Sequence, residues 1–240
     1  MTWRRPQTLI ASATCVLLLA MIAACASTQP PLGPLAAAVP APVYRTGDTW
    51  TYAARNSFND EPLGLWRYTV ASAANGEIHI AIARGAAAEP EIEIASAPGE
   101  FRLHALTNLT AYRFEAPFVA LNFPLTPGRS WRHTMPAFNT AAQRAQTVTV
   151  IGWVEGWERV HVPAGDFDAI RIERVAYAGD GDYVRTQTET YEREWYAPEI
   201  GAIVKREERS QWKALNMRSR PIIHGDRTTL ELTSVERSAR

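Results

Sequence analysis

The sequence predicts an all-β fold, namely an antiparallel, strongly curled sheet or open barrel with meander connections. Beyond residue 44, apolar and polar residues alternate with a period of two, as in Trp66, Tyr68 and Val70, which is the pattern of half-buried strands. Short turns that contain Gly, Pro and Asp separate these segments, and no segment after residue 44 keeps a helical period over three turns. These observations favour strands that pair with their neighbours along the chain.

The region from residue 157 to 209 shows the meander most clearly. Residues 163–166, 179–182 and 198–201 have the composition of tight turns, and the segments between them alternate as strands do. The in-out parity shifts after Ile172, which predicts a β-bulge near Glu173 and Arg174. Residues 135–144 and 215–226 are expected to form loops because of their Pro, Asn and Gly content.

Two short segments repeat one pattern. Residues 47–52 (GDTWTY) and 128–133 (GRSWRH) share Gly, a charged residue, a hydroxyl residue, Trp and an aromatic ring. One interpretation is a domain made of two related halves, about 44–120 and 121–240. The other is that Gly-x-[ST]-Trp is a favourable way to leave a turn and open a strand.

The first 24 residues have the pattern of a secretory signal peptide. Arg4 and Arg5 precede an apolar run, and no residue from 9 to 24 is charged, as in the charged and apolar regions of a signal. A membrane-spanning helix needs about 20 apolar residues and usually a charged stop, whereas the next basic residue here is Arg45. A cleaved signal is therefore the prediction, with a spanning anchor as the alternative.

Residues 22–25, Ile-Ala-Ala-Cys, resemble the bacterial lipobox. The resemblance implies cleavage between Ala24 and Cys25 and attachment of acyl chains such as palmitate to Cys25. The membrane then becomes a partner through these chains, since two or more chains give a stable anchor. Because Ala26 rather than aspartate follows the cysteine, the resemblance implies the periplasmic face of the cell outer membrane.

The predicted domain organisation follows from this signal. Residues 25–43 comprise the lipidated cysteine and a tether with five prolines, which favours an extended chain of about 3.1 Å per residue. Residues 44–240 form a single β domain. Cys15 and Cys25 are the two cysteines of the chain, so this domain contains no thiol and depends on its core for stability.

Composition argues against nucleic acid as a partner. The chain has 25 basic and 25 acidic residues, and two of the basic residues belong to the predicted signal. The remaining domain is slightly acidic, whereas binding of nucleic acid calls for a strongly basic face.

Two hairpin segments resemble a family of secreted bacterial β proteins, the TapB-like lipoproteins and related groups without an agreed activity. The first segment is V-H-V-P-A-G-D-F-D-A-I-R-I at 160–172, and the second is W-Y-A-P-E-I-G-A-I-V-K at 195–205. The resemblance covers about residues 120–210. It implies a β fold, with turns at Gly165 and Gly201, and it supplies no catalytic residue.

No pattern of residues indicates catalysis, a metal site or a cofactor. The five histidines are too widely spaced for a local ligand set, and no serine-hydrolase elbow or phosphate loop is present. Asp180 and Asp182 are better explained by a hairpin turn than by calcium. Glu189, Glu192 and Glu194 are interpreted as the solvated face of a long strand. We therefore expect no catalytic residue, no metal and no cofactor.

Tryptophan is the most informative side chain for binding. Seven of the eight tryptophans follow the signal, and the simplest explanation is a thick aromatic core. The alternative is an apolar groove on the concave face of the sheet. The candidates for lining such a groove are Trp66, Trp131, Trp153 and Trp195.

Two functions remain open from the sequence. The first is a non-catalytic binding or envelope-maintenance module with a protein or polysaccharide partner. The second is a carrier or sensor of a lipid-like ligand. They differ in cavity size, because only the carrier needs an apolar interior of several hundred Å³.

Overall fold

The computed structural model describes residues 35–85, 89–107, 110–179 and 184–238. Within these ranges the chain forms twelve strands and no helix. The strands are β1 (Thr49–Asn56), β2 (Glu61–Ala74), β3 (Glu77–Arg84), β4 (Glu91–Ala97), β5 (Glu100–Thr107), β6 (Thr110–Val119), β7 (Ser130–Asn139), β8 (Arg144–Val162), β9 (Gly165–Ala178), β10 (Arg185–Ala197), β11 (Ala202–Ala214) and β12 (Ile222–Glu236).

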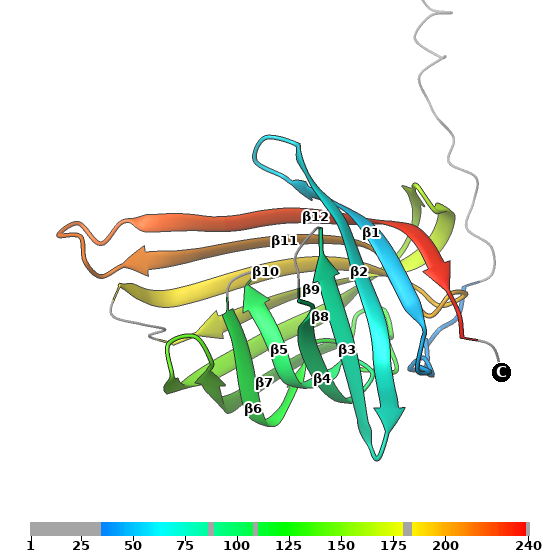
Figure 1. The fold of residues 1–240 in the computed structure, drawn as a ribbon, viewed down its shortest axis with the longest axis horizontal. Helices are drawn as coiled ribbons and strands as arrows, with labels where there is room; N and C mark the ends of the chain where they lie inside the picture. Colours follow the sequence, from blue (N-terminus) through cyan, green and yellow to red (C-terminus); the bar gives the residue numbers. More distant parts are fainter. Residues whose placement is uncertain (1–34, 86–88, 108–109, 180–183, 239–240) are drawn as a thin grey trace, which may run out of the picture. The chain divides into compact units, whose positions relative to one another are not determined.

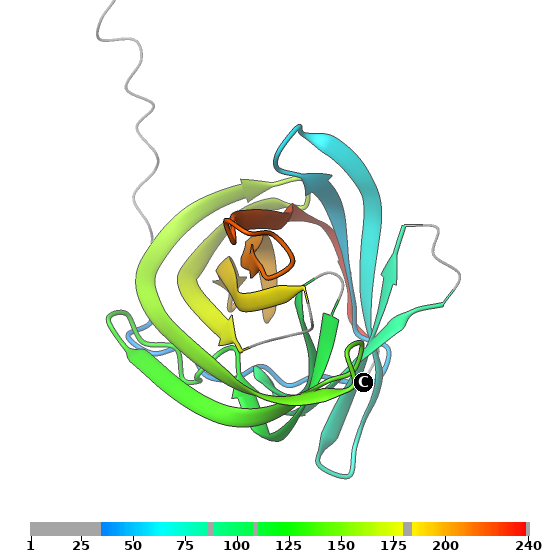
Figure 2. The same cartoon turned by 90° about the vertical axis from the view of Figure 1, so that its left-hand side faces the viewer.

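The strands form a closed antiparallel barrel (Figures 1 and 2). Each strand pairs with its neighbours in the sequence, and β1 pairs with β12 from Thr49 opposite Glu236 to Asn56 opposite Thr228. The predicted all-β antiparallel meander is confirmed. The sequence did not decide whether the barrel closes. The pairing of β1 with β12 closes it and removes the free edges that an open sheet exposes.

The β8–β9 hairpin has the predicted turn and a bulge at a different place. Val162 pairs with Gly165, and Gly165 has a φ of 134°, which glycine adopts without the strain that a Cβ causes. The register shifts between Val154 and Gly156 of β8, whereas β9 and β10 pair without a shift. The prediction of a bulge near Glu173 and Arg174 was therefore wrong, because the extra residue lies in the facing strand.

Two predicted loops are shorter in the structure. Residues 135–139 belong to β7, and residues 222–226 belong to β12. Pro136 is tolerated because β6 and β7 pair only where Tyr112–Phe114 face Ala137–Asn139, so a proline outside these pairs removes no hydrogen bond between the two strands.

The repeated Gly-x-[ST]-Trp segments make equivalent backbone contacts. The N–H of Gly47 donates to the carbonyl of Val70, and the N–H of Val70 donates to the carbonyl of Asp48. Gly128, Val154 and Arg129 repeat both bonds before β7. Both glycines have positive φ, 94° and 81°. The two segments thus start β1 and β7 in the same way, while an origin by duplication stays a prediction.

The chain is ordered before the predicted start of the domain at residue 44. Val39 and Leu125 exchange two backbone hydrogen bonds of 2.8 Å, and Val39 is 1% exposed. This part of the predicted 25–43 tether therefore lies against the β domain. The predicted signal at residues 1–24, with Ala24, and the lipid-attachment residue Cys25 fall outside the described residues.

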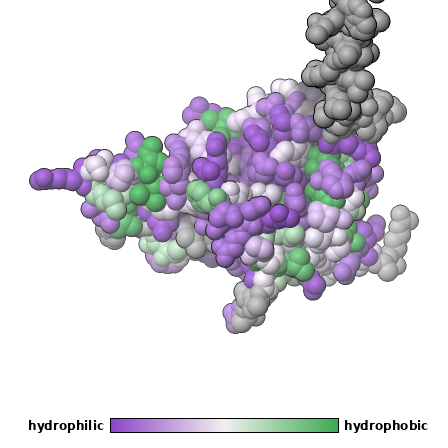
Figure 3. All heavy atoms as spheres, turned by 90° about the horizontal axis from the view of Figure 1, so that it is seen from above, coloured by the Kyte–Doolittle hydropathy of each residue, from purple (hydrophilic) through white to green (hydrophobic). Residues whose placement is uncertain are grey.

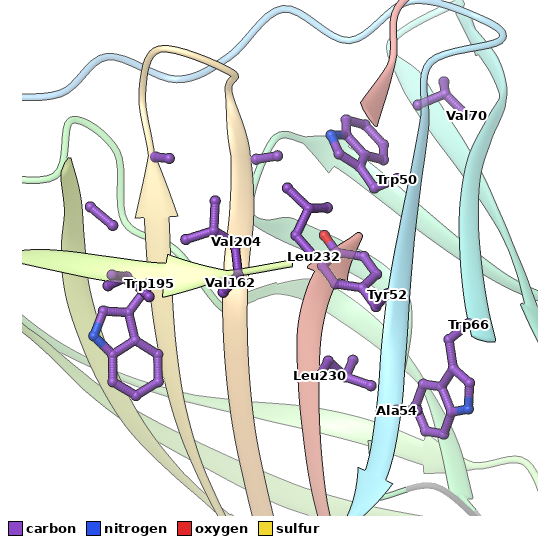
Figure 4. Close-up of a cluster of buried hydrophobic side chains, with 14 residues drawn as sticks. Trp50, Tyr52, Ala54, Trp66, Val70, Val162, Trp195, Val204, Leu230 and Leu232 are labelled. Atoms are coloured by element: carbon purple, nitrogen blue, oxygen red, sulfur yellow. The ribbon is translucent and has the colours of Figure 1, made fainter. Parts of the chain in front are cut away.

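Three clusters of buried apolar side chains stabilise the barrel. One is shown in Figure 4 and combines Trp50, Tyr52 and Leu232 with residues of the β8–β9 hairpin and of β11. The backbone N–H of Ala164, at the hairpin tip, donates to the carbonyl of Leu232 in β12 over 2.9 Å. The hairpin thus packs against strands that it does not pair with.

Candidate binding site

The barrel contains a small cavity that is lined by aromatic and ionisable side chains. Its volume is about 80 Å³, below the range of about 300 to 1,000 Å³ that is typical of sites for drug-sized ligands. Its aromatic lining residues are Tyr44, Trp50, Tyr52, Tyr68 and Phe101. Its ionisable lining residues are Glu93, His104, Arg174, Glu194 and Arg206.

A network of buried ions crosses β9, β10 and β11. Nη1 of Arg174 donates to Oε2 of Glu194 over 2.5 Å, and Nε of Arg206 donates to Oε1 of the same carboxylate over 2.6 Å. Arg174 also contacts Glu192. Burial by itself raises the pKa of Glu194, but the two guanidinium groups outweigh burial and lower the pKa to about 2. Glu194 is therefore ionised at neutral pH.

The pKa of Glu208 is shifted in the opposite direction from that of Glu194. Burial, followed by the negative charge of Glu192, raises its pKa to about 8. Its Oε1 is buried and has no hydrogen-bond partner among the described residues. The carboxyl group is thus largely protonated at pH 7.

A buried contact between a histidine and a carboxylate joins β4 and β5. Nδ1 of His104 lies 2.6 Å from Oε1 of Glu93, and the imidazole is stacked between Phe101 and Phe118 at centroid distances of 4.4 and 5.4 Å. Burial alone raises the pKa of Glu93, but the charge and hydrogen bond of His104, the charge of Arg206 and the backbone N–H of Ala105 together hold that pKa below its ordinary value. The pair keeps a carboxylate charged inside the barrel.

These contacts correct one interpretation of the sequence. Glu192 and Glu194 were expected on a solvated face, but their side chains are 9% and 2% exposed. Side chains alternate along a strand, so Glu189 and Arg193 lie on the other face of β10. The buried carboxylates are neutralised by guanidinium groups of adjacent strands, which the sequence of β10 does not reveal.

Two of the four tryptophans proposed for a groove are buried in separate places. Trp66 is 6% exposed and lies under the guanidinium group of Arg84, 4.4 Å from its ring centroid. Trp131 is also 6% exposed, and its Nε1 donates to the carbonyl of Val119 over 2.9 Å. Neither lines the 80 Å³ cavity.

Trp195 lies on the face of β10 opposite Glu194 and is 7% exposed. Its Nε1 donates to Oε2 of Glu158 over 2.7 Å, and it belongs to the same buried cluster as Trp66, at the other end of that cluster in Figure 4. The fourth candidate, Trp153, is half-buried, and its Nε1 donates to Oε1 of Glu155 over 2.5 Å. The structure therefore does not bring the four rings together.

Trp153 instead borders a groove on the outer face of β8–β12, which we call the outer groove. Its volume is about 360 Å³. Two rows of cross-strand neighbours line it. The first row consists of Trp153, Glu173, Arg193, Glu207 and Thr229, and the second contains Val175, Tyr191, Arg209 and Arg227.

The first row of the outer groove is an ion-pair ladder. Nε of Arg193 donates to Oε1 of Glu173 over 2.8 Å, and its Nη1 donates to Oε2 of Glu207 over 3.3 Å. Arg193 and Glu207 are 45% and 37% exposed, so water screens these pairs. The molecular face seen in Figure 3, which includes β12, is mostly hydrophilic.

Sequence reasoning singled out Trp153 and missed Tyr191, Arg209 and Arg227. These three residues lie in β10, β11 and β12, and only the pairing of these strands makes them neighbours. Arginine and tyrosine on the solvent face of a strand carry no local signal of binding.

In the described ranges no group of three or more His, Cys, Asp or Glu side chains is placed to hold a metal ion. Asp180 and Asp182 lie outside those ranges. The part of the chain that the structure describes contains no helix long and apolar enough to cross a membrane.

The fold and this surface define a class of protein: a twelve-stranded antiparallel barrel with buried ion pairs and an aromatic, charged outer groove. Residues 130–218 match the DUF3108-like family, so β7–β11 are similar to that family. No curated protein matches the sequence.

Three solved structures resemble the domain. An exported protein with a YmcC-like fold from Bacteroides fragilis is 15% identical, with 83% of this chain and all 100% of that chain covered at a TM-score of 0.49. A protein from Parabacteroides distasonis, described as a lipoprotein, is 12% identical, with 84% of this chain and 100% of that chain covered at a TM-score of 0.49. The lipoprotein YmcC from Escherichia coli is 9% identical, with 82% of this chain and 91% of that chain covered at a TM-score of 0.42.

Proposed function

We propose that this protein is a non-catalytic binding module of the bacterial cell envelope, anchored by acyl chains on Cys25 to the periplasmic face of the outer membrane. Cleavage before Cys25, after Ala24, produces the mature chain. The lipobox-like residues 22–25 support the anchor.

The difference in volume between the interior cavity and the outer groove carries the proposal. The cavity inside the barrel measures about 80 Å³, whereas the outer groove measures about 360 Å³. A carrier needs its space inside, but buried apolar side chains and the buried ion network leave a cavity of only about 80 Å³ inside this barrel. We therefore place the partner on the outer face of β8–β12.

A polysaccharide fits the chemistry of the outer groove better than an acyl chain does. Sugar rings present hydroxyl groups at their edges and C–H groups on their faces. The carboxylates and guanidinium groups of Glu207 and Arg193 suit the hydroxyl groups, and the rings of Trp153 and Tyr191 suit the C–H faces.

The test is co-sedimentation of the full-length protein, in nonionic detergent, with an insoluble polysaccharide fraction purified from the envelope of a two-membraned bacterium. We expect binding by the wild type and a loss of about 10-fold in affinity for Trp153→Ala, since burial of an aromatic ring contributes on the order of 1.4 kcal/mol or more. Arg67→Gln, an exposed change on β2, is the control. Equal binding by Trp153→Ala and the wild type would exclude the outer groove.

A carrier of a lipid-like ligand is the second candidate, because five Trp, Tyr and Phe rings line the interior cavity. Native mass spectrometry of the protein extracted from its own envelope tests this alternative. A bound lipid that leaves when Tyr52→Ala is introduced would favour the carrier over the outer groove.

A further inference from the structure

Two arginines face each other directly on the outer surface. Arg209 of β11 is the register partner of Arg227 of β12. Like charges at directly opposed positions of neighbouring strands destabilise a sheet. A pair held in this arrangement therefore has an unfavourable interaction that a bound anion would relieve.

Neither arginine has an anionic partner within the part of the chain that the structure describes. Each lies over an aromatic ring instead: Cζ of Arg209 is 4.5 Å from the ring centroid of Tyr191, and Cζ of Arg227 is 4.6 Å from that of Phe58. Stacking uses the face of the guanidinium plane and leaves its in-plane N–H groups available to an acceptor.

The neighbouring carboxylates are engaged elsewhere. Glu207 accepts from Arg193 over 3.3 Å and lies 2.9 Å from Nζ of Lys205. Glu189 accepts from the hydroxyl of Tyr191 over 2.7 Å and from Nε2 of Gln211 over 2.8 Å. The positive charge of the two arginines is thus not offset by these side chains.

A small pocket lies at the same place. Its volume is about 110 Å³, and Tyr191, Arg209, Gln211, His224 and Arg227 line it together with Ser210. Tyr191, Arg209 and Arg227 also line the outer groove. The small pocket therefore adjoins the groove and has donors suited to an anion of a few atoms, such as a carboxylate or phosphate group.

We propose that Arg209 and Arg227 form an anion subsite that binds a carboxylate or phosphate group carried by an envelope polysaccharide. The proposal deepens, and rests on, the proposed function of the outer groove. The sugar chain lies along the groove beside Trp153 and Tyr191, and its acidic substituent enters the pocket between the two guanidinium groups. The partner is then an anionic rather than a neutral polysaccharide.

Two polymers that differ only in charge test the subsite. Polygalacturonate carries a carboxylate on every sugar, and its methyl ester has the same backbone without the charge. For the full-length protein in nonionic detergent, we expect tighter binding of polygalacturonate, weakened by salt. Arg209→Gln and Arg227→Gln should each reduce its affinity about 10-fold, the size of one charge-assisted hydrogen bond, and should leave the weak binding of the ester unchanged.

Two control variants and one comparison with lipid vesicles separate the results. Arg67→Gln removes an exposed charge on β2 and should have no effect, and Arg209→Lys should restore part of the affinity. Equal binding of both polymers, lost in Trp153→Ala but not in Arg209→Gln, would overturn the anion subsite and leave the outer groove intact. Absence of binding to either polymer and to the envelope fraction would overturn both proposals. Arginine-dependent binding only to phosphatidylglycerol vesicles would assign the pair to a lipid surface and overturn the polysaccharide.

Discussion

Nη1 of Arg174 in β9 lies 2.5 Å from Oε2 of Glu194 in β10, and both side chains are 2% exposed. The register places Glu194 opposite Ile172 and Glu192 opposite Arg174, so one guanidinium group reaches two carboxylates. Arg206 of β11 completes the neutralisation of Glu194 from the other side. A barrel interior with this charge content depends on complete pairing.

Glu194→Gln should lower the free energy of unfolding by about 3 to 5 kcal/mol, because it removes the buried carboxylate charge that Arg174 and Arg206 share and leaves Arg174 with Glu192 alone. Denaturant unfolding at pH 7 measures the change. Glu115→Gln, at an exposed position of β6, is the control and should have little effect. A similar, small loss in both variants would contradict the role of the buried network.

The pH dependence of stability should show the low pKa of Glu194. Its pKa is about 2 in the folded protein and about 4.3 in an unfolded chain. The unfolded state therefore binds more protons between these values, and stability falls as the pH decreases from about 4.3 to about 2. Thermal melts between pH 2 and 6 should show this fall in the wild type, and Glu194→Gln should reduce its slope.

Glu208 should act in the opposite direction at higher pH. Its folded pKa of about 8 exceeds the unfolded value of about 4.3, so the folded state holds the proton over this range. Stability from this group is complete below about pH 4.3 and decreases as the pH rises towards 8. The difference in stability between Glu208→Gln and the wild type should therefore favour the variant more at pH 8 than at pH 5. An identical difference at both pH values would show that Glu208 is ionised when folded.

Trp195→Ala should cost about 3 to 5 kcal/mol of stability, as expected for a large buried ring, since Trp195 is 7% exposed and its indole N–H is bonded to Glu158. Trp153→Ala is the matched comparison, because Trp153 is half-buried at the outer groove. Its stability should fall less. Urea midpoints of the two variants test this order, and the reverse order would mean that Trp153 is the core residue.

Gly165→Val should destabilise the protein by about 1 to 3 kcal/mol, because a residue with a Cβ is strained at a φ of 134°. Space is not the cause, since the nearest atom to a Cβ at this position is 3.9 Å away. Gly156→Ala is the control, with open space around its Cβ and no positive φ. A thermal melt of Gly165→Val that equals the wild type would contradict the strain argument.

Cys25→Ser should release the protein from membranes without unfolding it. The proposed acyl chains hold the protein to the membrane, whereas the buried core of the barrel stabilises the fold. Cell fractionation, followed by a thermal melt of the released protein, measures both effects. Persistence of the variant in the membrane fraction with residues 1–24 still attached would favour a spanning anchor instead.

The sequence predicted much of the fold because strands and turns depend on neighbouring residues. Alternation in Trp66, Tyr68 and Val70 is a local property, and it predicts a strand that the structure contains as β2. The turn at Gly165 is equally local, because positive φ at one residue selects glycine. The resemblance at residues 160–172 and 195–205 lies within the family match at 130–218.

Polarity along one strand was a poor guide to the faces of β10. Glu194 is polar and faces the interior, while Trp195 is apolar and lies on the opposite face. Both are buried, because Arg174 and Arg206 neutralise the first and the β8–β9 hairpin packs with the second. The energy of either side chain is set by residues of other strands.

The sequence by itself determined the strand-rich domain, its meander order, its main turns and a signal-like N-terminus. Only the tertiary structure decided that β1 closes the barrel onto β12, that the interior is charged, and that Arg209 meets Arg227 across two strands. Alternation and turn propensity act within a few residues. Barrel closure, neutralisation of buried charges and the outer groove arise from contacts between distant residues, whose register is fixed only when the strands pair.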